Sequence, residues 1–131
     1  SNGDVGSIAT SGTSTAFNTS SDYRLKENVD YTFDATARLK QLKPARFNFI
    51  SDDTNTLVDG FLAHEVSSIV PEAITGDKDA TKVQDVFDSD GVKTGTETVP
   101  DYQGIDHSKL VPLLVKTIQE LEARIKTLED A

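Results

Sequence analysis

The hydrophobic and polar positions divide the chain into two stretches of different character. Residues 1–20 are built almost entirely from Ser, Gly, Thr, Asn and Ala, and their only larger apolar residues are Val5, Ile8 and Phe17. So few apolar side chains bury too little surface to form a core. We therefore predict an extended or irregular segment, either a disordered linker or the end of a fibrous β-structure that is ordered where several copies wrap together. From residue 21 onward apolar residues recur with clear periodicity, which predicts a compact domain.

The middle of the chain alternates between helical and strand patterns. We predict one helix over residues 34–42, with Asp34 as its N-cap and Lys43-Pro44 at its end. A second short helix is predicted over residues 63–69, since the residue before Pro71 avoids the helical region. Apolar or alternating runs predict strands over residues 45–50, 60–63, 73–75, 83–87 and 92–99.

The run Asp88-Ser89-Asp90-Gly91 predicts the turn that joins the last two strands into a hairpin. A similar run opens calcium-binding loops, but such a loop needs a glutamate at its twelfth position, where this chain has Val99. We therefore interpret the run as a turn.

The C-terminal segment has the strongest periodicity of the chain, and we predict a helix over residues 108–131 with Ser108 as N-cap. Its apolar residues alternate three and four positions apart and form a heptad seam of Val111, Leu114, Ile118, Leu121, Ile125 and Leu128. The seam predicts a coiled coil, although three heptads also fit an amphipathic helix packed on its own domain. β-Branched residues at the first core position and leucine at the second favour two strands.

Composition narrows the function classes. The chain has 131 residues and a net charge of −9, from 22 acidic and 13 basic residues, which argues against a nucleic-acid binder. No apolar run reaches the roughly 18 residues that a membrane span requires. The absence of methionine leads us to expect a piece of a longer protein. With no cysteine and only two histidines, His64 and His107, at no ligand spacing, we expect neither a metal site nor a cofactor.

Candidate chemistry lies at the boundary between the two stretches, where Ser21 and Lys26 are five residues apart. A serine hydroxyl becomes a nucleophile when a base removes its proton, and a lysine amine serves as that base when its pKa falls from about 10.4 towards roughly 7 to 8. Arg24 is a nearby positive charge that favours such a change. In a straight strand an odd separation sends the two side chains to opposite faces. The chain must therefore bend between them, or the pair must form between subunits.

The residues around this pair carry a family resemblance that spans residues 21–131. The run Ser21-Asp22-Tyr23-Arg24-Leu25-Lys26-Glu27-Asn28-Val29 resembles the opening motif of the C-terminal intramolecular chaperone domain of bacteriophage endosialidases, tailspikes, tail fibres and neck appendages. Further matching motifs follow in order: Leu42-Lys43-Pro44, then Gly60-Phe61-Leu62-Ala63-His64-Glu65-Val66 with Val70-Pro71-Glu72, and Tyr102-Gln103-Gly104-Ile105-Asp106-His107-Ser108-Lys109-Leu110.

The resemblance implies a single-turnover serine endopeptidase that cuts its own chain with a Ser-Lys dyad. The scissile bond is then Ser20–Ser21, with Ser21 as nucleophile and Lys26 as general base, and Arg24, His64 and Glu65 are candidate supporting residues. The family pattern often has Gln where this chain has His64. The resemblance also implies three copies, against the two-stranded preference of the seam.

Together, the residue patterns and the resemblance predict an α+β fold: a small mixed helix and β-hairpin domain whose long C-terminal helix forms a trimeric coiled coil, preceded by a short extended fibre remnant. Residues 1–20 are then the end of a phage fibre or spike, and residues 21–131 are the chaperone and autocleavage domain. The implied partners are two further copies of the chain and the upstream fibre, with neither nucleic acid nor membrane. The parent protein would belong to the virion, and the domain would act during assembly in the host cytoplasm and then be released.

A non-enzymatic alternative is a permanent trimerisation cap or a receptor-binding fibre tip, in which Ser21 and Lys26 are loop residues. A cap or tip stays attached in the finished particle, and this distinguishes it from a released chaperone. A hydrolase of host sugars would need a pair of carboxylates in a cleft, and the sequence contains no defensible pair.

Overall fold

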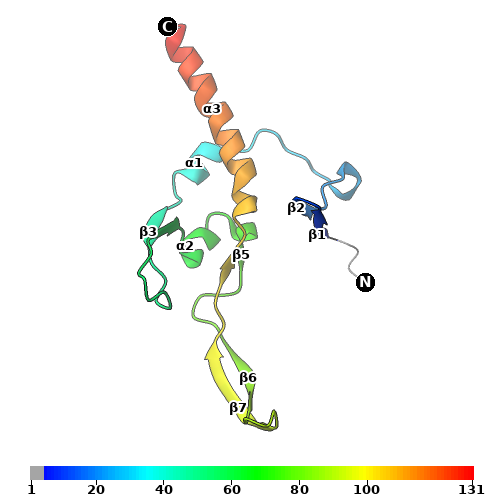
Figure 1. The fold of residues 1–131 in the computed structure, drawn as a ribbon. Helices are drawn as coiled ribbons and strands as arrows, with labels where there is room; N and C mark the ends of the chain where they lie inside the picture. The colour runs from blue at the N-terminus through cyan, green and yellow to red at the C-terminus, as the bar shows by residue number, and fades with distance from the viewer. Residues whose placement is uncertain (1–4) are drawn as a thin grey trace. The chain divides into compact units, whose positions relative to one another are not determined.

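The computed structural model describes residues 5–131, and the chain divides into two compact units, Ser1–Phe33 and Asp34–Ala131. We call them unit 1 and unit 2. Helices and strands both occur, with a long helix at the C-terminus, so the predicted mixed fold class is confirmed (Figure 1).

Unit 1 consists of a β-hairpin followed by one helical turn. Strands β1 (Gly6–Ser11) and β2 (Ser14–Thr19) pair antiparallel, with Ile8 opposite Phe17. Gly12 lies in the turn with a φ of 50°, a left-handed conformation that favours glycine. Every described residue of this unit is exposed, including Phe17 at 79%. The single chain therefore provides this hairpin with no core.

Unit 2 is assembled from short elements around a small core. In chain order they are α1 (Ala35–Leu39), β3 (Ala45–Phe47), β4 (Val58–Gly60), α2 (Ala63–Ser67), η2 (Pro71–Ala73), β5 (Ile74–Thr75), β6 (Thr81–Phe87), β7 (Lys93–Pro100), β8 (Gly104–Ile105), η3 (His107–Leu110) and α3 (Val111–Glu129), where η denotes a 3-10 helix. The strands pair antiparallel as β3–β4, β5–β8 and β6–β7. The buried core residues are Ala35, Val66, Val70, Ala73, Leu110 and Leu113.

Most predicted elements are present, although their ends differ. The helix predicted over residues 34–42 is α1, and Asp34 caps it by accepting a hydrogen bond from the Ala37 N–H at 3.2 Å. It ends at Leu39, three residues early. The strand predicted over residues 60–63 instead ends at Gly60, because α2 already begins at Ala63.

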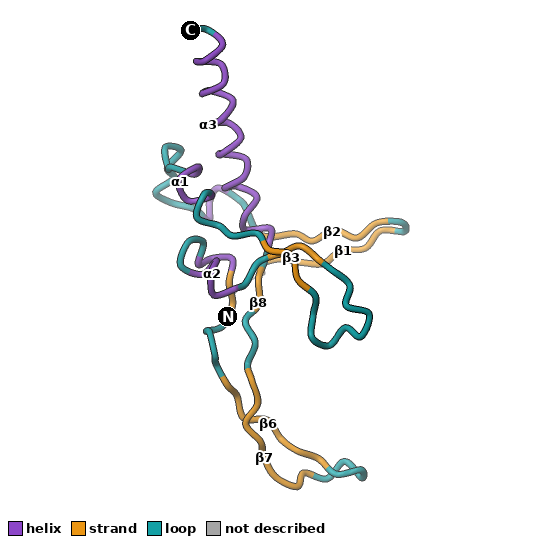
Figure 2. The backbone as a smooth tube through the Cα atoms, turned by 90° about the vertical axis from the view of Figure 1, so that its left-hand side faces the viewer, coloured by secondary structure: helices purple, strands orange, loops and turns teal. Residues whose placement is uncertain are grey.

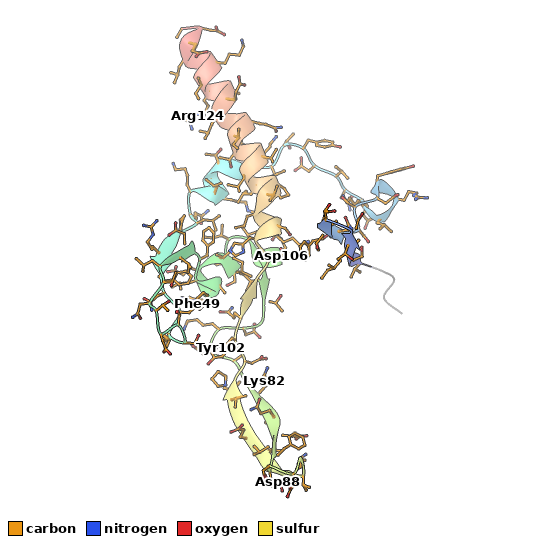
Figure 3. The ribbon with its side chains drawn as sticks, viewed as in Figure 1. Phe49, Lys82, Asp88, Tyr102, Asp106 and Arg124 are labelled. Atoms are coloured by element: carbon orange, nitrogen blue, oxygen red, sulfur yellow. The ribbon has the colours of Figure 1, made fainter. Side chains whose placement is uncertain are left out.

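The predicted turn at residues 88–91 is confirmed. The Asp88 carboxylate accepts hydrogen bonds from the N–H groups of Asp90 and Val92 at 2.9 and 3.0 Å, and Gly91 has a φ of 77°. Figure 3 shows Asp88 at the tip of the β6–β7 hairpin, with Lys82 nearer its base. Within unit 2, this hairpin and α3 extend in opposite directions from the core (Figures 1 and 2).

The predicted N-cap of the final helix is wrong. A 3-10 turn, η3, precedes α3, and its capping side chain is Asp106, which accepts hydrogen bonds from the Ser108 N–H and hydroxyl at 3.0 and 2.6 Å. Pro112 lies in the first turn of α3, where its missing N–H costs no helical hydrogen bond. Among the described residues, no helix combines the length and the apolar character needed to cross a membrane.

Candidate functional site

A 3-10 turn bends the chain between Ser21 and Lys26. The turn η1 spans Tyr23–Leu25, and its backbone closes through two hydrogen bonds, from Leu25 N–H to the Asp22 carbonyl and from Lys26 N–H to the Tyr23 carbonyl, both 3.1 Å. Sequence spacing required such a bend or a contact between subunits. The structure contains the bend within one chain.

The bend brings the candidate nucleophile and base into contact. Lys26 Nζ lies 2.7 Å from Ser21 Oγ, and as an ammonium it donates this hydrogen bond. A neutral amine at the same distance accepts the serine proton instead, which is the direction required of a general base. Both residues are exposed in the single chain.

The peptide bond before Ser21 joins the hairpin to the turn. The Ser20 N–H donates to the Val5 carbonyl at 3.0 Å, one step beyond the ladder that ends at Gly6 and Thr19. The Ser20 nitrogen is therefore held by the hairpin, and Ser21 is held by Lys26.

Asp22 and Arg24 form a two-pronged ion pair inside the turn. Asp22 Oδ1 accepts from the Arg24 backbone N–H at 2.9 Å and from Arg24 Nε at 2.8 Å, and Oδ2 accepts from Nη2 at 2.9 Å. The Arg24 side chain and backbone lower the pKa of Asp22, and Asp22 in turn raises the pKa of Arg24. The positive charge of Arg24 is thus offset by its own neighbour.

The other two candidate supporting residues, His64 and Glu65, lie in unit 2 on α2. Glu65 Oε1 is 3.6 Å from Lys43 Nζ, a partly exposed ion pair. The remaining histidine, His107, has its ring centroid 6.2 Å from that of Phe61. A supporting role for His64 or Glu65 stays a prediction.

The heptad seam of α3 is exposed in the single chain. Its six members, Val111, Leu114, Ile118, Leu121, Ile125 and Leu128, retain between 41% and 75% of their accessible surface. A different stripe of the same helix packs on unit 2: Leu113 and Thr117 are 4% exposed, and the Glu120 carboxylate accepts hydrogen bonds from the N–H groups of Ala35 and Thr36 and from the Thr36 hydroxyl. The seam is therefore not the surface by which α3 packs on its own domain.

The free surface of α3 continues beyond α1. Figures 1 and 2 show the last turns of the helix extending past α1. Because Ile125 and Leu128 lie there at 55% and 75% exposure, an apolar stripe runs the length of the helix without cover from its own unit.

No role was predicted for Asp22 from the sequence. The signal was nonetheless present, because Asp is a preferred N-cap residue and an Arg two positions later can reach back to its carboxylate. Among residues 5–131, no group of three or more His, Cys, Asp or Glu side chains gathers in a way that could hold a metal ion.

One family model matches the chain, over residues 21–75; it describes a peptidase family as "Chaperone of endosialidase". The match begins at Ser21, the first residue of the turn motif. No curated protein matches the chain.

Proposed function

Because residues 21–75 belong to the family of chaperones of endosialidase, we propose that this chain is an intramolecular chaperone that trimerises, assists the folding of a phage fibre, spike or appendage, and then cuts itself free. The match to this family supports the chaperone role. The observation that carries the proposal further is the 2.7 Å contact between Lys26 Nζ and Ser21 Oγ at the first residues of the family match.

The proposed cleavage has two steps. Ser21 Oγ attacks the Ser20 carbonyl carbon, the C–N bond breaks, and the hydroxyl proton passes through the Lys26 amine to the leaving Ser21 nitrogen. This produces an ester between the Ser20 carbonyl and Ser21 Oγ. A water molecule then hydrolyses the ester, leaving a Ser20 carboxylate and a Ser21 with a free amine and a restored hydroxyl.

The exposure of the seam supports assembly through α3. An unpaired apolar stripe on a helix stabilises association when it meets the same stripe on other copies. The exposed hairpin of unit 1 also supports assembly, since an isolated two-stranded hairpin is at best marginally stable in water. We propose three copies, in which the α3 seams form a coiled coil and residues 1–20 are the wrapped end of the fibre.

In this proposal, assembly determines when the chain is cut. A lysine in water is charged and donates to the serine, whereas burial disfavours the charged form of an amine. The dyad is exposed in the single chain, so in this proposal it becomes competent when neighbouring copies cover it. Cleavage then follows trimerisation.

Folding kinetics also favours a separate chaperone domain that trimerises before the fibre forms. Long-range strand pairing between chains is slow and prone to aggregation, and local helices that trimerise first raise the effective concentration of the fibre segments. Once the fibre has formed, cutting at Ser20–Ser21 removes the route back and traps it kinetically. In this proposal the parent fibre remains in the virion, and residues 21–131 are released in the host cytoplasm.

Intact-mass measurement of the purified chain tests the proposal. We expect a product of 111 residues that begins at Ser21, since the chain has 131 residues and 20 precede the cut. Ser21→Ala and Lys26→Ala should each leave the chain whole, whereas Ser11→Ala, a matched change at an exposed serine of β1, should be cut normally.

Two outcomes would contradict this function. A wild-type chain that assembles but never yields the product would refute self-cleavage. Residues 21–131 found attached in the mature particle would instead favour a permanent cap or a receptor-binding tip.

A further inference from the structure

A single carboxylate holds the turn that carries the candidate dyad. Asp22 accepts three hydrogen bonds from Arg24, one from the backbone N–H and two from the guanidinium, at 2.8 to 2.9 Å. The first caps the 3-10 turn, and the other two make the fork geometry that is the strongest form of arginine-carboxylate pairing.

The position of Lys26 depends on this turn. Five residues of extended chain span about 17 Å, a distance over which a lysine side chain cannot return to the serine. The turn folds the segment back through Lys26 N–H to Tyr23 carbonyl, and only then does Nζ come within 2.7 Å of Ser21 Oγ. No described side chain in this segment is buried, so packing within unit 1 offers the turn no other support.

We propose that Asp22 is the positioning residue of the self-cleavage reaction, which it serves by capping and clamping the turn that places the Lys26 amine on the Ser21 hydroxyl. This inference rests on the proposed function, because it concerns the rate of the same cut. The Arg24 side chain lowers the pKa of Asp22, so the carboxylate is ionised and able to accept all three bonds at neutral pH.

A positioning role predicts a particular order among substitutions of Asp22. Asn is as good an N-cap as Asp but carries no charge, whereas Glu keeps the charge on a longer side chain that does not cap well. If position matters, Asp22→Asn cuts faster than Asp22→Glu. If only the negative charge near Lys26 matters, the order reverses.

The expected sizes follow from the sensitivity of proton transfer to geometry, in which a misplacement of about 1 Å costs about 10²-fold in rate. We expect Asp22→Ala and Asp22→Glu to cut about 10- to 100-fold more slowly than wild type, and Asp22→Asn about threefold more slowly. The assay is cell-free synthesis of the full 131-residue chain, followed by a chase in which the fraction cut is measured against time.

Asp52→Ala is the matched control. Asp52 is a half-buried aspartate that also accepts a hydrogen bond from the N–H two residues later, Thr54, at 3.0 Å, but it lies in a loop of unit 2. We expect it to leave the rate unchanged. Sedimentation of each variant in a Ser21→Ala background reports whether assembly is intact, and if Asp22→Ala does not assemble, the ratio of the Asn to the Glu variant decides the question.

The inference is overturned if Asp22→Ala cuts within threefold of wild type, or if Asp22→Glu cuts faster than Asp22→Asn. These results are distinct from failure of the proposed function, in which the wild-type chain itself is not cut. An Asn variant that cuts faster than the Glu variant, by about 3- to 30-fold, supports a positioning role.

Discussion

Replacing Ile118 by alanine separates the stability of the single chain from the stability of the assembly. Ile118 lies in the middle of the α3 seam and retains 66% of its accessible surface in the single chain. Alanine is also the better helix former. We therefore expect Ile118→Ala to leave the folding of unit 2 nearly unchanged and to weaken the trimer.

The magnitude follows from the surface that remains to be buried. Full burial of an Ile side chain contributes about 1.5–3 kcal/mol, so two-thirds of it gives about 1–2 kcal/mol per chain and about 3–6 kcal/mol for three chains. That is a loss of about 10²- to 10⁴-fold in the trimer association constant. The midpoint concentration of a three-body equilibrium varies as the inverse square root of this constant, so it should rise about 10- to 100-fold.

Sedimentation equilibrium over a range of chain concentrations measures this midpoint, with Ser21→Ala present in every sample so that the chain keeps one mass. Leu113→Ala is the matched control on the same helix, because Leu113 is only 4% exposed and packs on its own unit. It should lower the unfolding free energy of the single chain by about 2–5 kcal/mol. The reasoning is refuted if Ile118→Ala shifts the midpoint less than threefold, or if it destabilises the single chain as much as Leu113→Ala does.

Three further predictions concern unit 2. The Thr36 hydroxyl is the main cause of the lowered pKa of Glu120, so the stability from this contact is complete above the ordinary value of 4.5 and is lost as pH falls through the lowered pKa. Thermal unfolding between pH 3 and pH 7 should therefore show a steeper loss of stability in acid for wild type than for Glu120→Gln, and parallel curves would contradict this assignment. Thr117 Oγ1 is buried without a hydrogen-bond partner, so Thr117→Val should raise the urea unfolding free energy by about 1 kcal/mol; a lower value would mean that the hydroxyl has a partner in solution. Val66 is 1% exposed in the core, and Val66→Ala should cost about 2 kcal/mol in the same assay, a loss that an unchanged unfolding midpoint would rule out.

Local features of the chain were predictable because each depends on neighbours in sequence. The Asp34 cap, the turn at Asp88 and the heptad spacing of the last helix each depend on residues that are only a few positions apart. The predicted N-cap at Ser108 was wrong because a 3-10 turn, η3, lies between β8 and α3. Asp106 caps that turn, and α3 itself begins without a side-chain cap.

The candidate site was predictable as a pair of residues but not as an arrangement. Spacing alone required either a bend between Ser21 and Lys26 or a contact between subunits, without saying what would form the bend. The structure supplies Asp22, whose carboxylate caps the turn and clamps Arg24. Three hydrogen bonds converging on one side chain depend on torsion angles that composition and spacing do not specify.

The sequence by itself determined that the final helix carries an apolar seam, since a repeat of three and four residues places those side chains on one face wherever the helix lies. Only the tertiary structure decided which face meets the chain's own domain. Leu113, Thr117 and Glu120 pack against unit 2, and the seam at Ile118 and Leu121 remains exposed. The physical reason is that a helix can bury more than one stripe, and the choice depends on contacts with α1, more than 70 residues earlier in the chain.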